Sequence, residues 1–399
     1  MIALDLLRFG QLDVRGRRVF LRADLADRVT PVGQLKSDAL GRQLLPALEA
    51  LVRERCKVVV AGHSAPNDRA TPRAVAGLLS TLLKKPVLEL GNDFAAGVRV
   101  LGEGQVAVAP NLEAFSEERT NDVRWAHRLA RAFDVYVCEA LASARDVRAS
   151  TVALPRLVPA RAPGPVLERD LRALADFSTQ ISPPFVAVVG GSDLAQKAAL
   201  MRFLVAHADA LLVGGVIANT FLALQGWHPA LSAYESENIP IAQEIAKLAE
   251  ARGVSLFLPS DALVARRRGG RTVQLEVRAI SDVKADEGVI DIGVNTLRTY
   301  ENVVRQASTV LWNGALGSRD EEASLEGTRT VLAAALDAAP YSGVVGEDSV
   351  ELATKLGFSS SFRWVARSGR AVLDLLAGKP MPGLESLVVT PTRPIAASF

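Results

Sequence analysis

The chain has 399 residues, more than one ordinary hydrophobic core holds, so its length favours two domains. It carries 46 lysines and arginines against 44 acids, and this net charge of +2 excludes a general attraction to nucleic acid or anionic membrane. Its 2 cysteines have no CxxC spacing, which argues against a disulfide framework or a zinc site. Charges scattered through the first residues argue against a signal peptide, so we expect a soluble, cytoplasmic protein.

Short β-branched runs alternate with apolar stretches at helical spacing along the whole chain. Strands are expected, in chain order, at 18–21, 58–60, 106–109, 135–137, 186–189, 211–213, 255–258, 309–311 and 343–345. Helices are expected between them, for example at 44–53, 125–132 and 240–252. This alternation predicts an α/β fold with parallel sheets that helices cover on both faces.

Proline-rich sequence between 155 and 165 divides the chain, and Ser182-Pro183-Pro184 opens a second series of strands. We expect two doubly wound domains with a ligand cleft between them. The expected boundaries are 1–165 for the first domain, 166–179 for a connecting helix, 180–379 for the second domain and 380–399 for a tail that returns to the first domain or to a partner.

The segment AVVGGSDLAQKAAL at 187–200 has the layout of a phosphate-binding strand, turn and helix. A strand ends at Gly190-Gly191, and the helical pattern after it contains Lys197. Asp193 lies at the mouth of this turn, where its charge repels phosphate. Ser192 and Asp193 are both good helix N-cap residues, so we expect the acid to stabilise the helix rather than to serve phosphate transfer.

Ten segments in order resemble phosphoglycerate kinase over about residues 17–383. They are RRVFLRADL (17–25), VVVAGHSAP (58–66), DVYVCEALASARDVRAST (134–151), FVAVVGGSD (185–193), LLVGGVIANTFL (211–222), LPSDALVA (258–265), IDIGVNT (290–296), TVLWNGALG (309–317), VVGEDS (344–349) and GKPMPG (378–383). The resemblance implies two Rossmann-like domains, the first binding 3-phosphoglycerate and the second binding ATP or ADP with Mg²⁺. It also implies the glycolytic transfer of a phosphoryl group from ATP to 3-phosphoglycerate after closure about a hinge.

The N-terminal half departs from this family where the acidic substrate binds. Arg22 and Asp24 remain in the R-x-D-F-N-x-P segment, but Ala26 replaces the substrate-contacting Asn. Leu40 stands where the family has the arginine that stabilises the transferring phosphoryl group, and Asp146 replaces a substrate arginine. Loss of such an arginine costs about 10³ to 10⁵ in rate in other systems.

Three basic residues remain near these positions. His63 is retained without its arginine neighbour, and Arg145 and Arg148 flank Asp146. Arg145 and Arg148 could rebuild a small anion site with His63 by the fork geometry of guanidinium groups. Asp24 is kept as a possible substrate-binding residue, and Asp24 and Lys197 are the retained candidates for a catalytic role. The alternative is that both arginines are solvated surface side chains and that His63 is a packed histidine.

The nucleotide half matches the family more fully, with Asp348 at the position that carries Mg²⁺ and Lys197 at the second of two family lysines. The matching nucleotide-side residues are Gly190, Gly191, Lys197, Gly214, Gly215, Asn313, Gly314, Asp320, Asp348 and Ser349, with Asp320 standing for the ribose-binding Glu and Ser349 in a helix-capping position. The alternative is that the glycines serve only turns and that Asp348 is a helix cap.

Two departures weaken the expectation of triphosphate binding. Asp193 replaces the lysine that the family directs at the transferred phosphate. Arg367 and Ser368 lie where the family has a glycine triplet whose bare amides approach the phosphates, although Arg367 and Arg370 could bring positive charge there. We therefore predict a relative with weak or no activity and a regulatory or binding role.

Two alternatives stay open. One is an active phosphoglycerate kinase, or a phosphotransferase for another small phosphorylated or carboxylic acid, that uses rearranged arginines. The other is an interaction scaffold without a ligand, with a protein partner. The basic run Arg266-Arg267-Arg268-Gly269-Gly270-Arg271 could mark nucleic-acid binding, but without interleaved aromatic residues we interpret it as a solvated turn between strands and expect neither nucleic acid nor membrane as a partner.

Overall fold

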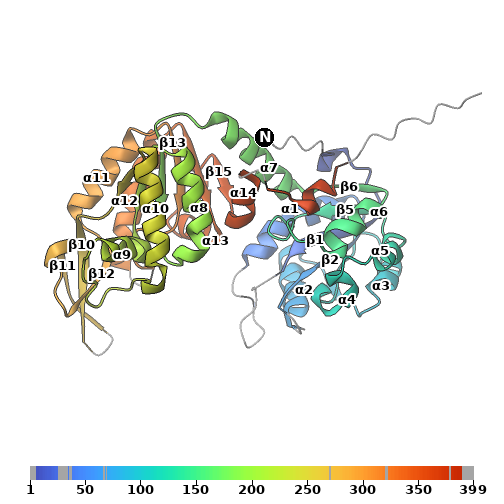
Figure 1. The fold of residues 1–399 in the computed structure, drawn as a ribbon. Helices are drawn as coiled ribbons and strands as arrows, with labels where there is room; N and C mark the ends of the chain where they lie inside the picture. The colour runs from blue at the N-terminus through green and yellow to red at the C-terminus, as the bar shows by residue number, and fades with distance from the viewer. Residues whose placement is uncertain are drawn as a thin grey trace, which may run out of the picture. The chain divides into compact units, whose positions relative to one another are not determined.

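The computed structural model describes residues 6–25, 35, 38–65, 68, 70–268, 271–319, 322–376 and 379–388. The chain divides into two compact units, one formed by Met1–Arg172 with Gly378–Phe399 and the other by Ala173–Ala377. The division falls within α7 (Pro165–Gln180), the helix expected at 166–179 (Figure 1). Ala26, Asp320 and residues 389–399 of the tail lie outside the described residues.

The first unit is built on a parallel sheet of six strands in the order β3-β4-β2-β1-β5-β6. The strands are β1 (Arg18–Asp24), β2 (Lys57–His63), β3 (Val87–Glu89), β4 (Val106–Val108), β5 (Val135–Cys138) and β6 (Ala160–Pro163). Its helices are α1 (Ala39–Arg53), α2 (Ala70–Leu83), α3 (Phe94–Val100), α4 (Ser116–Arg119), α5 (Val123–Ala130), α6 (Leu154–Leu157) and α15 (Pro382–Glu385).

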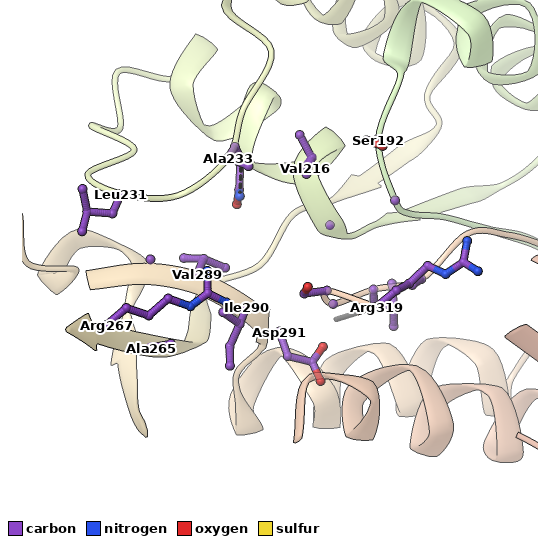
Figure 2. Close-up of a pocket in the computed structure, with 18 residues that line it drawn as sticks. Ser192, Val216, Leu231, Ala233, Ala265, Arg267, Val289, Ile290, Asp291 and Arg319 are labelled. Atoms are coloured by element: carbon purple, nitrogen blue, oxygen red, sulfur yellow. Dashed lines mark hydrogen bonds between the residues drawn. The ribbon is translucent and has the colours of Figure 1, made fainter. Parts of the chain in front are cut away.

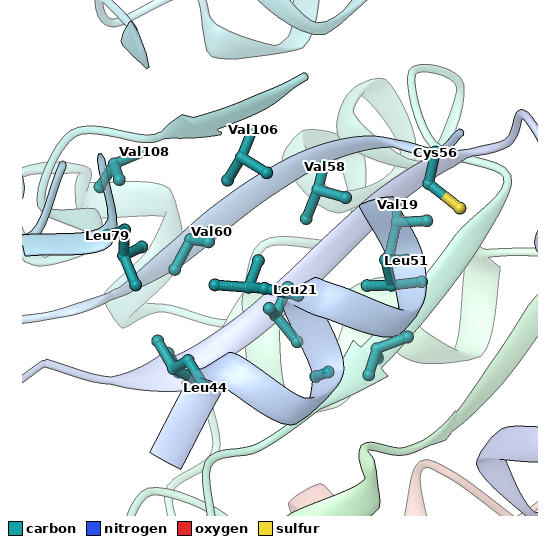
Figure 3. Close-up of a cluster of buried hydrophobic side chains, with 14 of the residues drawn as sticks. Val19, Leu21, Leu44, Leu51, Cys56, Val58, Val60, Leu79, Val106 and Val108 are labelled. Atoms are coloured by element: carbon teal, nitrogen blue, oxygen red, sulfur yellow. The ribbon is translucent and has the colours of Figure 1, made fainter. Parts of the chain in front are cut away.

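Its core forms because α1 is apolar on one face and β1 and β2 are apolar on both. Leu44 and Leu51 of α1 pack against Leu21 and Val58 of the sheet, and all four side chains are fully buried (Figure 3). Burying one such side chain contributes about 1.5–3 kcal/mol. The cluster thereby fixes the carboxyl ends of β1 and β2, where Asp24 and His63 lie.

The second unit is built on another parallel sheet of six strands, in the order β15-β14-β13-β7-β8-β9. The strands are β7 (Phe185–Val189), β8 (Ala210–Val213), β9 (Ser255–Phe257), β13 (Thr309–Asn313), β14 (Tyr341–Val345) and β15 (Trp364–Ala366). Its helices are α8 (Leu194–His207), α9 (Gly215–Leu224), α10 (Ile239–Arg252), α11 (Val294–Arg305), α12 (Glu326–Ala338), α13 (Glu347–Lys355) and α14 (Gly369–Leu376), with α8 beside α10 and α11 beside α12 (Figure 1).

A three-stranded antiparallel sheet, which the sequence did not predict, extends the second unit. Its order is β11-β10-β12, formed by β10 (Asp261–Arg268), β11 (Arg271–Ala279) and β12 (Glu287–Ile292). The basic run expected as a solvated turn is therefore mostly strand, since residues 266–268 end β10 and residue 271 begins β11. The run thus joins two strands as expected, with its arginines extending into both strands, and residues 269 and 270 lie outside the described residues.

The two cysteines both lie in the first unit as buried free thiols. Burial raises the pKa of Cys56 to about 11 and that of Cys138 to about 12. Neither thiol is therefore ionised near neutral pH, and neither is a nucleophile there. Among the described residues, no helix has both the length and the apolar character needed to cross a bilayer.

Helix α7 begins against a buried carboxylate. Glu139 is 1% exposed and accepts hydrogen bonds from the amides of Val166 (3.1 Å) and Leu167 (2.8 Å) in the first turn. Burial nevertheless raises the pKa of Glu139 to about 8, because desolvation outweighs the two amide donors. Gly164 precedes the helix, and a Cβ there would collide with this carboxylate.

The raised pKa of Glu139 predicts a specific loss of stability with rising pH. Between the unfolded pKa of 4.5 and the folded pKa of about 8, the folded state holds one more proton, so stability falls by roughly 1.4 kcal/mol per pH unit from this group. Glu139→Gln removes this slope. We expect denaturant unfolding from pH 5 to 9 to show the unfolding free energy of the variant rising relative to that of the native chain as pH rises. A difference in unfolding free energy that does not change with pH would contradict this.

Candidate functional site

A pocket of about 390 Å³ opens in the second unit beside the carboxyl ends of its parallel strands. The turn after β7, the start of α9, the loop after β13 and the antiparallel sheet all contribute to its wall. Arg267 and Arg319 line opposite ends of it, and Asp291 lies between them (Figure 2). Carboxyl edges of such sheets are where α/β proteins bind ligands.

Glycines in the wall of this pocket and beside it let backbone pack directly on backbone. A Cβ on Gly190 would collide with the carbonyl of Ala315, and a Cβ on Gly215 would lie 2.6 Å from the amide of Gly191. Gly215 also has a φ of +62°, which disfavours other residues. Gly214 and Gly314 are similarly confined, against Leu316 and against Gly190 respectively. Fold alone therefore explains these glycines, whether or not a ligand binds.

Lys197 is the cation nearest the glycines. Its Nζ donates a hydrogen bond of 2.6 Å to the carbonyl of Gly190. Burial lowers its pKa to about 8, although the carboxylates of Asp348, Asp193 and Glu235 act in the opposite direction. The ammonium group is thus charged at neutral pH but poorly solvated, which suits contact with an anion.

The N-terminus of α8 already has two carboxylates. Asp193 is its N-cap and accepts a hydrogen bond of 3.1 Å from the amide of Gln196, which confirms the predicted capping role. Glu235 accepts hydrogen bonds from the amides of Asp193 and Leu194. Asp193 also has a left-handed φ of 66°, a conformation that Asp and Asn tolerate better than Lys. Ser192 lines the pocket and is not the cap.

Asp348 presents an exposed carboxylate at the start of α13. Its side chain is 84% exposed, and Arg319 lies 3.4 Å from it. The N-cap of α13 is Gly346, so Asp348 and Ser349 lie within the first turn and neither is the cap that the sequence suggested. An exposed carboxylate fits Mg²⁺ when nucleotide phosphates supply further oxygens, although Arg319 competes for it. No cluster of three or more metal-ligating side chains exists among the described residues.

Arg367 lies at the end of β15, where it precedes Ser368 and α14. Its Nη1 is buried and has no hydrogen-bond partner among the residues described. Asn313, at the end of β13, also leaves its Oδ1 buried and unbonded there, while its Nδ2 donates to the carbonyl of Val345. Unsatisfied buried polar groups are rare, so this part of the carboxyl edge has polar atoms able to contact a ligand.

The first unit contains a buried polar cluster at the carboxyl ends of β1 and β2. The guanidinium of Arg22, which is fully buried, contacts Nδ1 of His63 at 2.7 Å and the hydroxyls of Ser143 and Ser150. Nε2 of His63 lies 2.7 Å from Oε1 of Glu118. Ser150 donates to Glu118 through both its amide and its hydroxyl.

Electrostatics inside this cluster favour a neutral histidine and an ionised acid. Burial, followed by the charge of Arg22, lowers the pKa of His63. Burial alone would raise the pKa of Glu118, but hydrogen bonds from His63 and Ser150 outweigh it and lower that pKa. The negative charge of Glu118 thus balances the positive charge of Arg22, with the imidazole of His63 between them. Each ring nitrogen of His63 already has a partner within the protein.

The other substrate-side residues are also engaged within the protein. Asp24 accepts hydrogen bonds from the amides of Ala142 and Ser143 and from the Ser143 hydroxyl. Arg148 pairs with Glu113 at 3.0 Å, and Arg145 lies 3.9 Å from Asp146. Leu40 is 2% exposed and belongs to the core of the unit, so it is not directed at a ligand.

Comparison with known proteins decides the family, since a family model for phosphoglycerate kinase matches residues 9–379. The chain belongs to the phosphoglycerate kinase family. The phosphoglycerate kinase of Desulfosudis oleivorans is 32% identical over 386 residues, covering 94% of this chain and 97% of the relative. That of Anaeromyxobacter sp. (strain K) is 34% identical over 389 residues, with coverage of 94% and 97%. The structure of phosphoglycerate kinase from Coxiella burnetii superposes with a TM-score of 0.79 at 31% identity, covering 96% and 98%.

Membership of the phosphoglycerate kinase family confirms the fold and leaves the roles of individual site residues as predictions. Two acids in the candidate sites, Glu118 and Glu235, were not predicted from the sequence. Acids are usually exposed, and neither residue stands out in a motif. The only available signal for Glu235 was its place shortly before the capping pattern of α10.

The geometry at Asp193 predicts how the α8 turn responds to substitution. Asp193→Ala removes the capping side chain and places an alanine, which has a Cβ, in a left-handed backbone conformation. We therefore expect a loss of about 1–2 kcal/mol in unfolding free energy. Asp193→Asn keeps an acceptor and tolerates this φ, so its change should stay within about 0.5 kcal/mol. Urea unfolding measures both, and equal losses would contradict the capping role.

Glu118 is expected to be far more important for stability than its neighbour Glu117. Removing a fully buried carboxylate leaves Arg22 uncompensated, so Glu118→Ala should cost roughly 3–5 kcal/mol. Glu117 accepts a solvent-exposed hydrogen bond from the adjacent Ser116, and Glu117→Ala should change stability by less than about 0.5 kcal/mol. Denaturant unfolding of the two variants tests this, and similar values would show that the buried cluster is not ionic.

Proposed function

We propose that this member of the phosphoglycerate kinase family binds an adenine nucleotide in its second unit and has weak or no phosphoryl-transfer activity. The observation that carries the proposal is the internal pairing of the basic groups in the first unit. Arg22 faces His63 and Glu118, and Arg148 pairs with Glu113. Binding a multiply charged acid there would require these pairs to separate, which costs several kcal/mol for buried charges.

The nucleotide half supports retention of a ligand. The pocket beside the glycine turns is open, and Lys197 offers a poorly solvated ammonium group. Nη1 of Arg367 has no hydrogen-bond partner within the part of the chain that the structure describes. Asp348 would hold Mg²⁺ together with the nucleotide, and the ion would supply charge neutralisation of the phosphates. A regulatory or sensing role follows from nucleotide binding without efficient turnover. The cytoplasm stays the predicted location.

An active phosphoglycerate kinase is the second candidate, and the comparisons by themselves favour it. Named relatives align over 94% of the chain, and all of them are called phosphoglycerate kinase. Under this hypothesis Arg145 and Arg148 exchange their present partners for the acid substrate. Arg145 is 38% exposed and its partner Asp146 44%, so that pair separates at little cost. The third candidate, a scaffold without ligand, accounts poorly for an open pocket of about 390 Å³.

Calorimetric titration separates these candidates. We expect Mg-ADP or Mg-ATP to bind and 3-phosphoglycerate to give no signal. Ala233→Trp, which fills the pocket from an exposed position, should weaken nucleotide binding at least about tenfold, or about 1.4 kcal/mol. Ala206→Trp on the exposed end of α8 is the matched control and should leave affinity unchanged.

A coupled turnover assay with ATP and 3-phosphoglycerate completes the test. Turnover at ordinary kinase rates of about 1–100 per second, abolished in Lys197→Ala, would overturn the proposal in favour of the active enzyme. If activity is weak, Asp193→Lys should raise it, because it restores the cation at the family's phosphate-directed position. Absence of any nucleotide binding would support the scaffold.

A further inference from the structure

Strand β11 carries an apolar stripe that nothing in the described chain covers. Val273, Leu275 and Val277 are 58%, 42% and 50% exposed, and they are three of the ten exposed large hydrophobic side chains in the described residues. Alternate residues of a strand share one face, so Leu275 and Val277 project together, opposite Ala265 and Leu263 of β10. Val273 continues the stripe at a bulge in the register.

The same strand lies at the edge of its sheet. β11 pairs only with β10 in the described structure, so every second amide and carbonyl of β11 points away from the sheet. Proteins usually protect such edges with proline, charged side chains, bulges or short length. β11 has nine residues and no proline or lysine, and its protection is limited to the bulge near Val273 and to the charged side chains of Arg271, Glu276 and Arg278. An apolar edge of this kind is a surface for adding another strand.

The sequence of the edge is complementary to itself. Residues 273–277 read Val-Gln-Leu-Glu-Val, which has the same apolar and polar pattern in both directions about Leu275. We propose that β11 pairs with β11 of a second copy in antiparallel orientation about a twofold axis at Leu275. In this register Val273 faces Val277 of the partner copy on the apolar face, and the two Leu275 side chains meet at the axis.

Polar residues on the other face fit the same register. Gln274 faces Glu276 of the other copy. The Gln274 amide donates to Glu276 within one copy, so on each side of the axis it can exchange this bond for one to the partner's carboxylate. Shifting the register to centre on Glu276 would instead oppose two carboxylates. The arginines at 266–268 stand at the turn end of the hairpin, so antiparallel pairing separates the two basic ends, whereas parallel pairing would place them side by side.

The interface is small and adjoins the nucleotide pocket. Ala265, opposite Leu275 in register, also lines the pocket. One added strand pair buries less than the roughly 1,200–2,000 Å² of a standard stable interface. The association is therefore expected in the micromolar range, with a dissociation constant of about 1–100 µM.

Sedimentation velocity of the full chain from about 1 µM to about 200 µM tests the association. The native protein should shift from monomer to dimer, and Leu275→Lys should weaken dimerisation at least about tenfold. Val100→Lys is the matched control, because Val100 is 84% exposed on α3 in the other unit, and it should dimerise like the native chain. A native chain that stays monomeric throughout would overturn the proposal, as would dimerisation unaffected by Leu275→Lys.

Mixing two variants tests the register. Leu275→Lys and Leu275→Glu each place like charges at the axis and should be monomeric alone, with native circular dichroism showing that both fold. Their equimolar mixture should recover dimer, because the introduced lysine of one copy would meet the introduced glutamate of the other only in the twofold register. Failure to recover dimer from two folded variants would rule out pairing about Leu275.

Discussion

The second unit depends on direct contact between backbones at the carboxyl edge of its sheet. Gly190, Gly314 and Gly215 allow the turn after β7, the loop after β13 and the start of α9 to meet without intervening side chains. This contact shapes the pocket and draws the Lys197 ammonium onto the carbonyl of Gly190. Both the fold and the candidate site therefore require glycine where these backbones meet. For this reason the glycines cannot by themselves distinguish a working kinase from an inactive relative.

The two units differ in how their charges are satisfied. In the first unit each retained basic group of the candidate substrate site has an acid nearby, and the central one, Arg22, is fully buried. Among the described residues of the second unit, Nη1 of Arg367 has no hydrogen-bond partner and Nζ of Lys197 donates to the carbonyl of Gly190. An anionic ligand is thus more readily accommodated in the second unit than in the first, because fewer existing pairs must break.

The sequence predicted nine of the twelve parallel strands, because most of them are continuous apolar runs, such as those of β2 and β7, that end at glycine or a polar turn. It missed the short strands β3, β6 and β15, which have three, four and three residues. The antiparallel sheet was missed, since charged residues interrupt the apolar residues of its strands and a run of arginines ends β10. Asp193 was predicted as a cap from local pattern alone. The partners of Arg22, His63 and Arg148 could not be predicted, because Glu118 and Glu113 reach them only through the tertiary fold.

The placement of the thiols has a practical consequence. Cys56 and Cys138 are the only cysteines of the chain, and both are buried in the first unit. A thiol reagent can reach them only when that unit opens, whereas opening of the second unit exposes no thiol at all. Labelling kinetics would therefore report the local unfolding of one half of the protein without interference from the other, in the native chain and without any engineered probe.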